Sequence, residues 1–219
     1  MEIHAPHHPV LTVKEALVHL AIITTGILIA LSLEGALEWS HHRELVGETR
    51  VRLRDEIRGN QESVQIVLKG LAPARMRFTR AIDLASRMSS PGALEEAEPL
   101  FNPVRGGSLL SGMSFAFFNT AAYTTAEVTG AFGFMDYSET VRYADTYDLQ
   151  ALYVRMQDGI EKDLFAAATL GSSLLTKPTP TEVEDVKRQL RLALGGLAII
   201  ENLANDLNER YSRVLKDAP

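Results

Sequence analysis

The histidines of this chain, its most versatile catalytic and metal-binding side chains, are confined to one end of the sequence. All six lie at or before His42, and none of the 219 residues is a cysteine. Thiolate chemistry, disulfides and thiolate metal sites are therefore excluded. A Ser-His-Asp triad or a histidine-ligated metal centre later in the chain would have to borrow a histidine from the N-terminal end, so we expect neither there.

Two histidine groups have spacings that could bind a metal. Glu38 and His41 have the Glu-x-x-His spacing of di-iron helical bundles, but such sites need a second copy of the motif, which the sequence lacks. We therefore interpret this pair as charges near lipid headgroups. His4, His7 and His8 cluster among prolines and could hold a metal if a partner supplied further ligands. A solvated or docked tail is the simpler interpretation.

Two glycine-containing segments resemble catalytic loops only in part. Residues 112–116 read Gly-Met-Ser-Phe-Ala, which lacks the second glycine, the preceding strand and the later histidine of a nucleophile elbow. Residues 130–133 lack the spacing of a phosphate-binding loop. The sequence thus predicts no catalytic, cofactor-binding or metal-binding residue, and we expect that the protein is not an enzyme.

The strongest feature of the sequence is an apolar run from Ala16 to Leu33 that contains no Asp, Glu, Lys or Arg. At about 1.5 Å per residue, this run nearly spans a hydrocarbon core of about 30 Å. A soluble helix would show a polar stripe, so we predict a transmembrane helix, with a fully buried core helix as the alternative. Lys14 is the only Lys or Arg before the run, and no Ala-x-Ala site follows it. The helix is therefore expected to be a retained anchor and not a cleaved signal peptide.

Polar residues at the ends of this anchor predict its position in the membrane, and small residues within it predict contact with another helix. Thr12 and Glu15 form a predicted capping box, and Glu38, Trp39 and the His41-His42-Arg43 cluster lie where lipid would meet water. Small residues four apart would let another helix approach closely: Ala21 with Thr25, and Gly26 with Ala30. The predicted docking residues for a partner are His4, His7, His8, His19, Glu34 and Trp39.

Prolines divide the next part of the chain into predicted helices. No proline lies between Pro9 and Pro73, so one helix could continue for roughly sixty residues, about 90 Å. Its second half carries a stripe with spacings of three and four: Leu45, Thr49, Leu53, Ile57, Asn60, Val64, Val67 and Leu71. Other faces would carry Arg50, Arg52, Arg54, Asp55, Glu56 and Arg58. A shorter helix is expected from Pro73 to Met88, followed by a loop over 91–112 with one helical turn at 94–98.

Helix signals continue in the second half of the sequence. Residues 119–129 are small or aromatic and are followed by Gly130 and Gly133, typical helix-stop residues. A capping box at 136–139 predicts the start of a helix that could reach Leu175. A second box at 181–184 predicts the start of the last helix. The last helix carries an unbroken stripe: Val183, Val186, Leu190, Ala193, Leu197, Ile200, Ala204, Leu207, Tyr211 and Val214. This stripe predicts coiled-coil-like packing against the preceding helix, and because no segment alternates as strands do, the predicted fold class is all-α.

Several of these stretches resemble a known family. The run from Gly26 to Leu31, Gly-Ile-Leu-Ile-Ala-Leu, with its acidic and tryptophan-bearing interface, resembles the N-terminal anchor of an uncharacterised bacterial family of single-span membrane proteins. The stretches 56–60 and 120–147 are also similar to it. The chain departs from that pattern at His19 and Ala36, where the family has an acidic residue and a tryptophan. The resemblance implies a membrane anchor with a helical domain and no known activity.

Together these features predict three regions: a His/Pro-rich tail over 1–11, a transmembrane anchor over 12–39 and an extramembrane helical bundle over 40–219. The formal net charge of −6 argues against nucleic acid as a partner. We expect a non-catalytic accessory, scaffolding or assembly subunit of a complex in the bacterial inner membrane. It would contact the bilayer and other membrane subunits through the anchor and tail.

Two questions stay open at this level. A sensory or ligand-binding bundle is the alternative function, in which aromatic rings would line a pocket: Phe115, Phe117, Phe118, Tyr123, Phe132 and Phe134. Core filling is the simpler interpretation of these rings. Lys14 stands alone before the apolar run, whereas five arginines lie between Arg43 and Arg58. This bias favours a cytoplasmic C-terminal domain and leaves a periplasmic one open.

Overall fold

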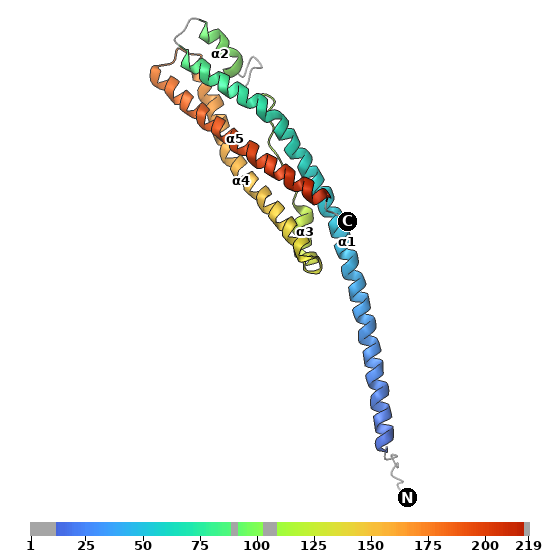
Figure 1. Ribbon diagram of the computed structural model, residues 1–219. Coiled ribbons are helices and arrows are strands. Elements are labelled where there is room, and N and C mark those ends of the chain that lie inside the picture. The colour runs from blue at the N-terminus through green and yellow to red at the C-terminus, as the bar shows by residue number, and fades with distance from the viewer. Residues whose placement is uncertain (1–11, 89–91, 103–108, 217–219) are drawn as a thin grey trace, which may run out of the picture. The chain divides into compact units, whose positions relative to one another are not determined.

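The structure, a computed structural model, describes residues 12–88, 92–102 and 109–216. Figure 1 shows the helices: α1 (Val13–Ser86), α2 (Ala93–Phe101), α3 (Ala121–Val128), the 3₁₀ helix η2 (Ala131–Phe134), α4 (Tyr137–Ser173) and α5 (Pro180–Lys216). These ranges contain helices and connections but no strand, which confirms the predicted all-α class. The chain divides into two compact units after Glu48, and α1 contributes to both.

The first unit is the N-terminal part of α1. Its predicted capping box is confirmed: the Thr12 amide donates to the Glu15 carboxylate at 2.7 Å, and the Glu15 amide donates to the Thr12 hydroxyl at 3.4 Å. Beyond this cap the helix is long and apolar enough to cross a membrane, and none of the residues in its most apolar window is buried within the protein. The alternative of a buried core helix is therefore wrong.

The rest of α1 belongs to the second unit and carries the predicted stripe. Leu53, Ile57 and Val64 are fully buried, and Thr49, Asn60, Val67 and Leu71 are nearly so. The expected break at Pro73 is wrong, because α1 continues through this residue to Ser86. Proline removes one helical hydrogen bond. However, the buried register continues beyond it through Ala74, Phe78, Ala81 and Leu84, and this packing holds the helix together.

Helices α4 and α5 pack against each other as an antiparallel hairpin (Figure 1). Nine of the ten predicted stripe positions of α5 are buried, all except Val183, and Gly196 joins them because Ile160 of α4 packs against it. The capping box of α5 lies two residues earlier than predicted. The Thr179 amide donates to Glu182 at 2.7 Å, and Pro180 takes the first helical position, where its missing N–H costs nothing.

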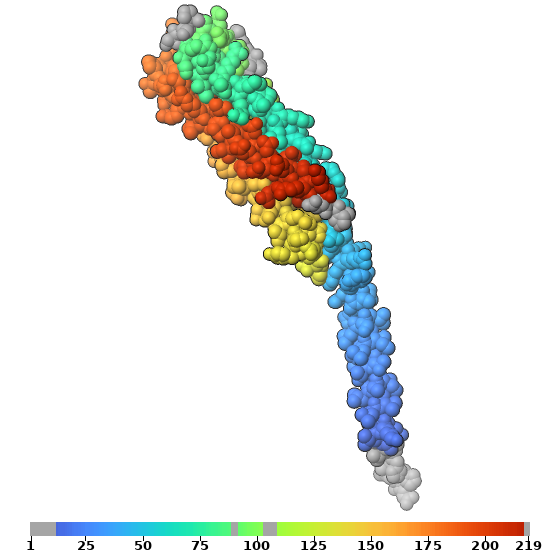
Figure 2. Space-filling view, in the orientation of Figure 1, coloured from blue at the N-terminus to red at the C-terminus, as the bar shows by residue number. Residues whose placement is uncertain are grey.

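Helix α1 lies beside both members of this hairpin. Figure 2 shows α1 and α5 side by side on the visible face of the second unit. Arg75 of α1 pairs with Glu201 of α5 at 2.5 Å, and Gln61 of α1 donates to the Ser212 hydroxyl at 2.7 Å. On the α4 side, the Arg50 guanidinium donates two hydrogen bonds to the Glu139 carboxylate, at 2.8 and 2.7 Å. The three long helices thus enclose one core.

The short elements correct two expectations and confirm one. Helix α2 spans nine residues, more than the predicted single turn, because Ala93, Ala97 and Phe101 form a buried stripe. Gly130 follows the end of α3 in the left-handed conformation, with φ 72°, as predicted for a helix stop. Gly133 is not a stop, because it lies inside η2.

Candidate functional site

The predicted membrane-contact residues lie on the exposed first unit. Ala21, Thr25, Gly26 and Ala30 are all exposed on α1, and a Cβ added at Gly26 would meet nothing within 4 Å. Spacings of four place each pair on one helix face. The surrounding large side chains are uncovered too, with Ile23, Ile27 and Leu31 each more than half exposed. This unit therefore presents a continuous apolar surface that nothing in the described chain covers.

The predicted docking residues are only partly described. His19, Glu34 and Trp39 are exposed on α1, whereas His4, His7 and His8 lie outside the described residues. The Arg43 guanidinium lies over the Trp39 ring, 5.2 Å from its centroid, a cation–π arrangement. His41 and Glu38 are exposed, and no group of three or more potential metal ligands occurs in the described part of the chain.

The second unit contains a buried carboxylate, Glu56, that accepts three hydrogen bonds. Glu56 was expected on an outer face of α1, but its side chain is buried and points at the first turn of α3. Its oxygens accept hydrogen bonds from the Ala122 amide at 2.7 Å, the Tyr123 amide at 3.3 Å and the Tyr147 hydroxyl at 2.6 Å. The free amides at a helix N-terminus favour a negative charge. Glu56 thus acts as a tertiary cap that fixes α3 to α1 and α4.

Two buried side-chain amides bind the chain that leads into α3. Asn60 accepts from the Asn119 amide and donates to the Asn119 carbonyl, both at 2.8 Å. Gln157 accepts from the Ala116 amide at 2.8 Å and donates to the Ala116 carbonyl at 3.1 Å. Buried main-chain N–H and C=O groups need hydrogen-bond partners, which a neighbouring strand or helical turn usually supplies. Here the side-chain amides of Asn60 and Gln157 supply them.

A second layer of hydrogen bonds joins these groups across the bundle. The Asn60 amide also donates to the Gln150 oxygen at 3.1 Å, and the Tyr211 hydroxyl of α5 donates to the same oxygen at 2.5 Å. Burial raises the pKa values of Tyr147, Tyr153 and Tyr211, and the hydrogen bond to Glu56 raises that of Tyr147 further. These phenols therefore stay protonated at physiological pH, and the hydroxyls of Tyr147 and Tyr211 act as hydrogen-bond donors. The Tyr153 hydroxyl, although fully buried, has no hydrogen-bond partner among the described residues.

The polar network is suited to structure more than to catalysis. Its carboxylate and side-chain amides form hydrogen bonds with main-chain groups, with phenols or with one another, and all six histidines lie in the first unit. Residues 113–116 of the elbow-like segment run without helix or strand, and the Ala116 main chain is held by Gln157. The described residues of the second unit thus bring no histidine to a serine, threonine or carboxylate.

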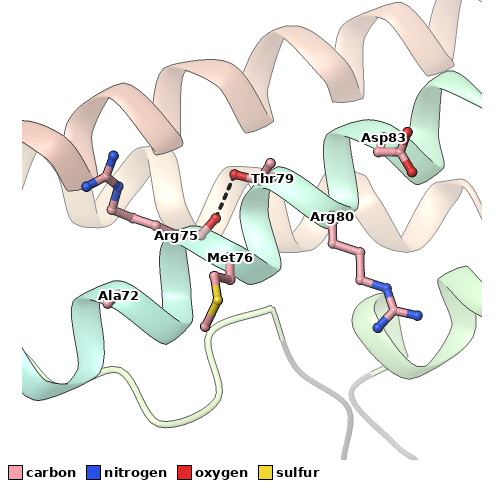
Figure 3. Close-up of a pocket in the computed structure, with 6 residues that line it drawn as sticks. All are labelled: Ala72, Arg75, Met76, Thr79, Arg80 and Asp83. Atoms are coloured by element: carbon pink, nitrogen blue, oxygen red, sulfur yellow. Dashed lines mark hydrogen bonds between the residues drawn. The ribbon is translucent and has the colours of Figure 1, made fainter.

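A hollow on the exposed face of α1 is open to solvent. Figure 3 shows this hollow, lined by Ala72, Arg75, Met76, Thr79, Arg80 and Asp83. All six residues come from one helix, and the only hydrogen bond between them joins the Thr79 hydroxyl to the Arg75 carbonyl, at 2.9 Å. A groove of this kind offers a surface but no converging polar groups of the sort that orient a small ligand.

The six aromatic residues of the alternative prediction are dispersed. The Tyr123 ring contacts Phe132 and stacks on Tyr147, with centroids 5.3 and 4.3 Å apart. The Phe118 ring meets Tyr153 edge-on at 5.5 Å, whereas Phe117 is 83% exposed. The rings therefore do not line one common cavity among the described residues.

Sequence reasoning missed most of the buried network. Asn60 was placed on the core stripe, but Glu56, Gln150 and Gln157 were not identified. A signal for the last two exists in α4, where a stripe with spacings of three and four includes polar residues: Tyr143, Tyr147, Gln150, Tyr153, Gln157, Ile160, Leu164, Ala167 and Gly171. Polar groups at such positions need internal partners.

Comparisons of the chain with protein-family models, with curated proteins and with solved structures found no match.

Proposed function

We propose that this protein is a single-span accessory, scaffolding or assembly subunit of a larger bacterial membrane complex and has no catalytic role. The observation that carries the proposal is the bare apolar surface of the first unit. A helix with large side chains exposed on every face is stable only where lipid or another apolar helix covers it. A helix that contacts only lipid could carry large side chains on every face. Gly26 and Ala30 have small side chains on one face, which lets a second helix approach closely there.

The second unit supports a binding role more than a chemical one. Its buried polar groups are engaged in holding the fold, as the three hydrogen bonds to Glu56 illustrate. Its surface carries large apolar side chains such as Val128 and Phe117, both 83% exposed. A membrane-anchored bundle of this kind serves by contact with other subunits.

We place the chain in the inner membrane with its bundle on the cytoplasmic side. Arginines flank the C-terminal end of the apolar run and only Lys14 precedes it, and the positive side of a span usually stays in the cytoplasm. A fusion of alkaline phosphatase after Pro219 tests this orientation. Active phosphatase, which needs the periplasm to fold, would reverse it.

The assembly role is tested at Gly26. Gly26→Leu fills the shallow face with a side chain that meets nothing in the chain itself, so the bundle should stay folded. We expect the subunits that co-purify at fixed stoichiometry after mild detergent extraction to fall at least tenfold, and Gly26→Ala to have a milder effect. Quantitative mass spectrometry measures both.

Thr24→Leu is the control, because it places the same leucine side chain about 200° away around the helix. It should leave co-purification unchanged. If Gly26→Leu retains its partners in full, the small residues face lipid and the proposed helix contact is wrong. If the wild-type chain extracts alone, the subunit role itself is wrong.

A further inference from the structure

The main chain of one segment of the second unit is held by side chains of two helices, as the main chain of a bound peptide would be. Residues 113–120, called the strap here, form neither helix nor strand and run between α1 and α4, as Figure 1 shows in light green. No main-chain hydrogen bond of the described chain joins one strap residue to another. The strap's main chain is held by side chains that project from the two long helices.

The contacts are directed at the main chain of the strap. Asn60 of α1 makes a two-point contact with Asn119, and Gln157 of α4 makes the same two-point contact with Ala116. Each pair satisfies one N–H and one C=O, as a neighbouring strand would. Because every residue except proline has these two groups, such contacts recognise a stretched main chain and not particular side chains.

Side chains of the strap contribute little selectivity. Ala116 is buried and requires a small residue, and the Phe118 ring lies against Tyr153. Phe117 between them points away and is 83% exposed. The segment also carries no charge, since the only charged residue from 113 to 135 is Glu127. The occupant that this groove fits is therefore an uncharged, stretched segment with a small residue at one position.

We propose that the groove between α1 and α4, in which Asn60 and Gln157 hold the strap, is a peptide-binding groove that the strap fills in the free protein. An uncharged, extended segment of a partner takes the place of the strap when the two proteins meet. The tethered strap competes at the high effective concentration of an intramolecular ligand, so the free protein keeps its groove closed. This proposal does not depend on the membrane helix and goes beyond the assembly role proposed above.

The test uses the full-length protein in detergent and a fluorescein-labelled synthetic peptide of residues 111–122 with a solubilising charged tag. Ala116→Lys places a charge at a buried position of the strap and leaves the groove unchanged, so it should expel the strap. Hydrogen exchange of the strap amides of Ala116 and Asn119, which donate to Gln157 and Asn60, measures the expulsion. Phe117→Lys is the matched control, because the neighbouring side chain is already in solvent.

We expect Ala116→Lys to lose amide protection in the strap while α4 and α5 keep theirs, and to bind the peptide at least tenfold more tightly than the wild type or Phe117→Lys. Adding Asn60→Ala should then weaken peptide binding at least tenfold, since it removes both contacts to Asn119. An open strap without peptide binding would overturn the proposal, as would binding that ignores Asn60→Ala.

A second variant covers the case in which a buried lysine unfolds the bundle. Gly70→Ala presses on the strap's entry through the carbonyl of Gly112, which lies 2.7 Å from the added Cβ, and introduces no charge. It should raise exchange in the strap and strengthen peptide binding to a smaller degree. If both variants unfold the whole second unit, the strap is an inseparable part of the core and the groove is not a binding site.

Discussion

The close passage of the chain over Gly70 allows a sharp test of the fold. Gly70 lies in α1 at the point where the turn before the strap crosses the helix. A Cβ added there would lie 2.7 Å from the Gly112 carbonyl oxygen, closer than the 3.4 Å at which ordinary van der Waals contact begins. Gly112 has a φ of 69°, so its carbonyl is fixed by a left-handed turn and not by a flexible side chain. Gly59 in the same helix has nothing within 4 Å.

The two glycines should therefore respond differently to alanine. In a helix interior, Gly→Ala stabilises by about 1 kcal/mol, which is the full effect expected for Gly59→Ala. Gly70→Ala gains the same helix preference but must displace a main-chain carbonyl, which costs about 1–3 kcal/mol. The free energies of unfolding of the two variants should differ by about 1–3 kcal/mol. For a chain of this size, each kcal/mol shifts the melting temperature by about 2–4 °C.

Near-UV circular dichroism of the full-length protein in detergent can follow this unfolding, because the buried tyrosines all lie in the second unit. The expected order of melting temperatures is Gly59→Ala above wild type and Gly70→Ala below Gly59→Ala. If the two variants are equally stabilised, the turn at Gly112 does not press on α1 and the described path of the strap is wrong.

Other perturbations probe the buried tyrosines and the seam of α5. Tyr147→Phe removes a hydrogen bond to the Glu56 carboxylate and should cost about 1.5–3 kcal/mol, whereas Tyr153→Phe removes an unpartnered hydroxyl and should be neutral or stabilising in the same melts. Burial raises the folded-state pKa of both phenols, so their contribution is complete below the unfolded pKa near 10 and is lost at higher pH. Unfolding midpoints from pH 8 to 11 should fall above pH 10, and a flat profile would contradict the burial. Leu197→Asp, at a fully buried seam position, should cost several kcal/mol, and Arg191→Asp on the exposed face should be nearly silent; equal melting would show that α5 is not packed as described.

The sequence alone determined those features that depend on neighbouring residues in the chain. The apolar run of α1 and the stripe of α5 follow from side-chain type and helical period, and nine of the ten predicted stripe positions of α5 are buried. The capping box at Thr12 was also predicted, because its partners are three residues apart. For α5 the cap was placed two residues late, since Pro180 in the first helical turn makes Thr179 the better cap.

At several positions, tertiary packing outweighed the helix preference of the residue itself. Pro73 is a helix breaker by its own chemistry, but the buried residues on either side of it keep one register in contact with the core. Gly70 and Gly171 lower local helix preference, yet each lies where another segment comes too close for a side chain: the Gly112 carbonyl at Gly70 and the Phe101 ring at Gly171. Local preference is worth about 1–3 kcal/mol per residue, and packing over many side chains exceeds it.

The buried network was the least predictable part of the molecule. Glu56 and Asn60 lie one helical turn apart on α1, and their partners in the strap, α3 and α4 are about sixty to ninety residues away in sequence. The α4 stripe signals that Gln150 and Gln157 are buried, but no polar residue reveals in the sequence which distant donor or acceptor will pair with it. The sequence therefore determined which segments are helical and which stretch is apolar on all sides. Only the tertiary structure, which brings distant main-chain groups to these side chains, decided where the strap lies and which polar residues hold it.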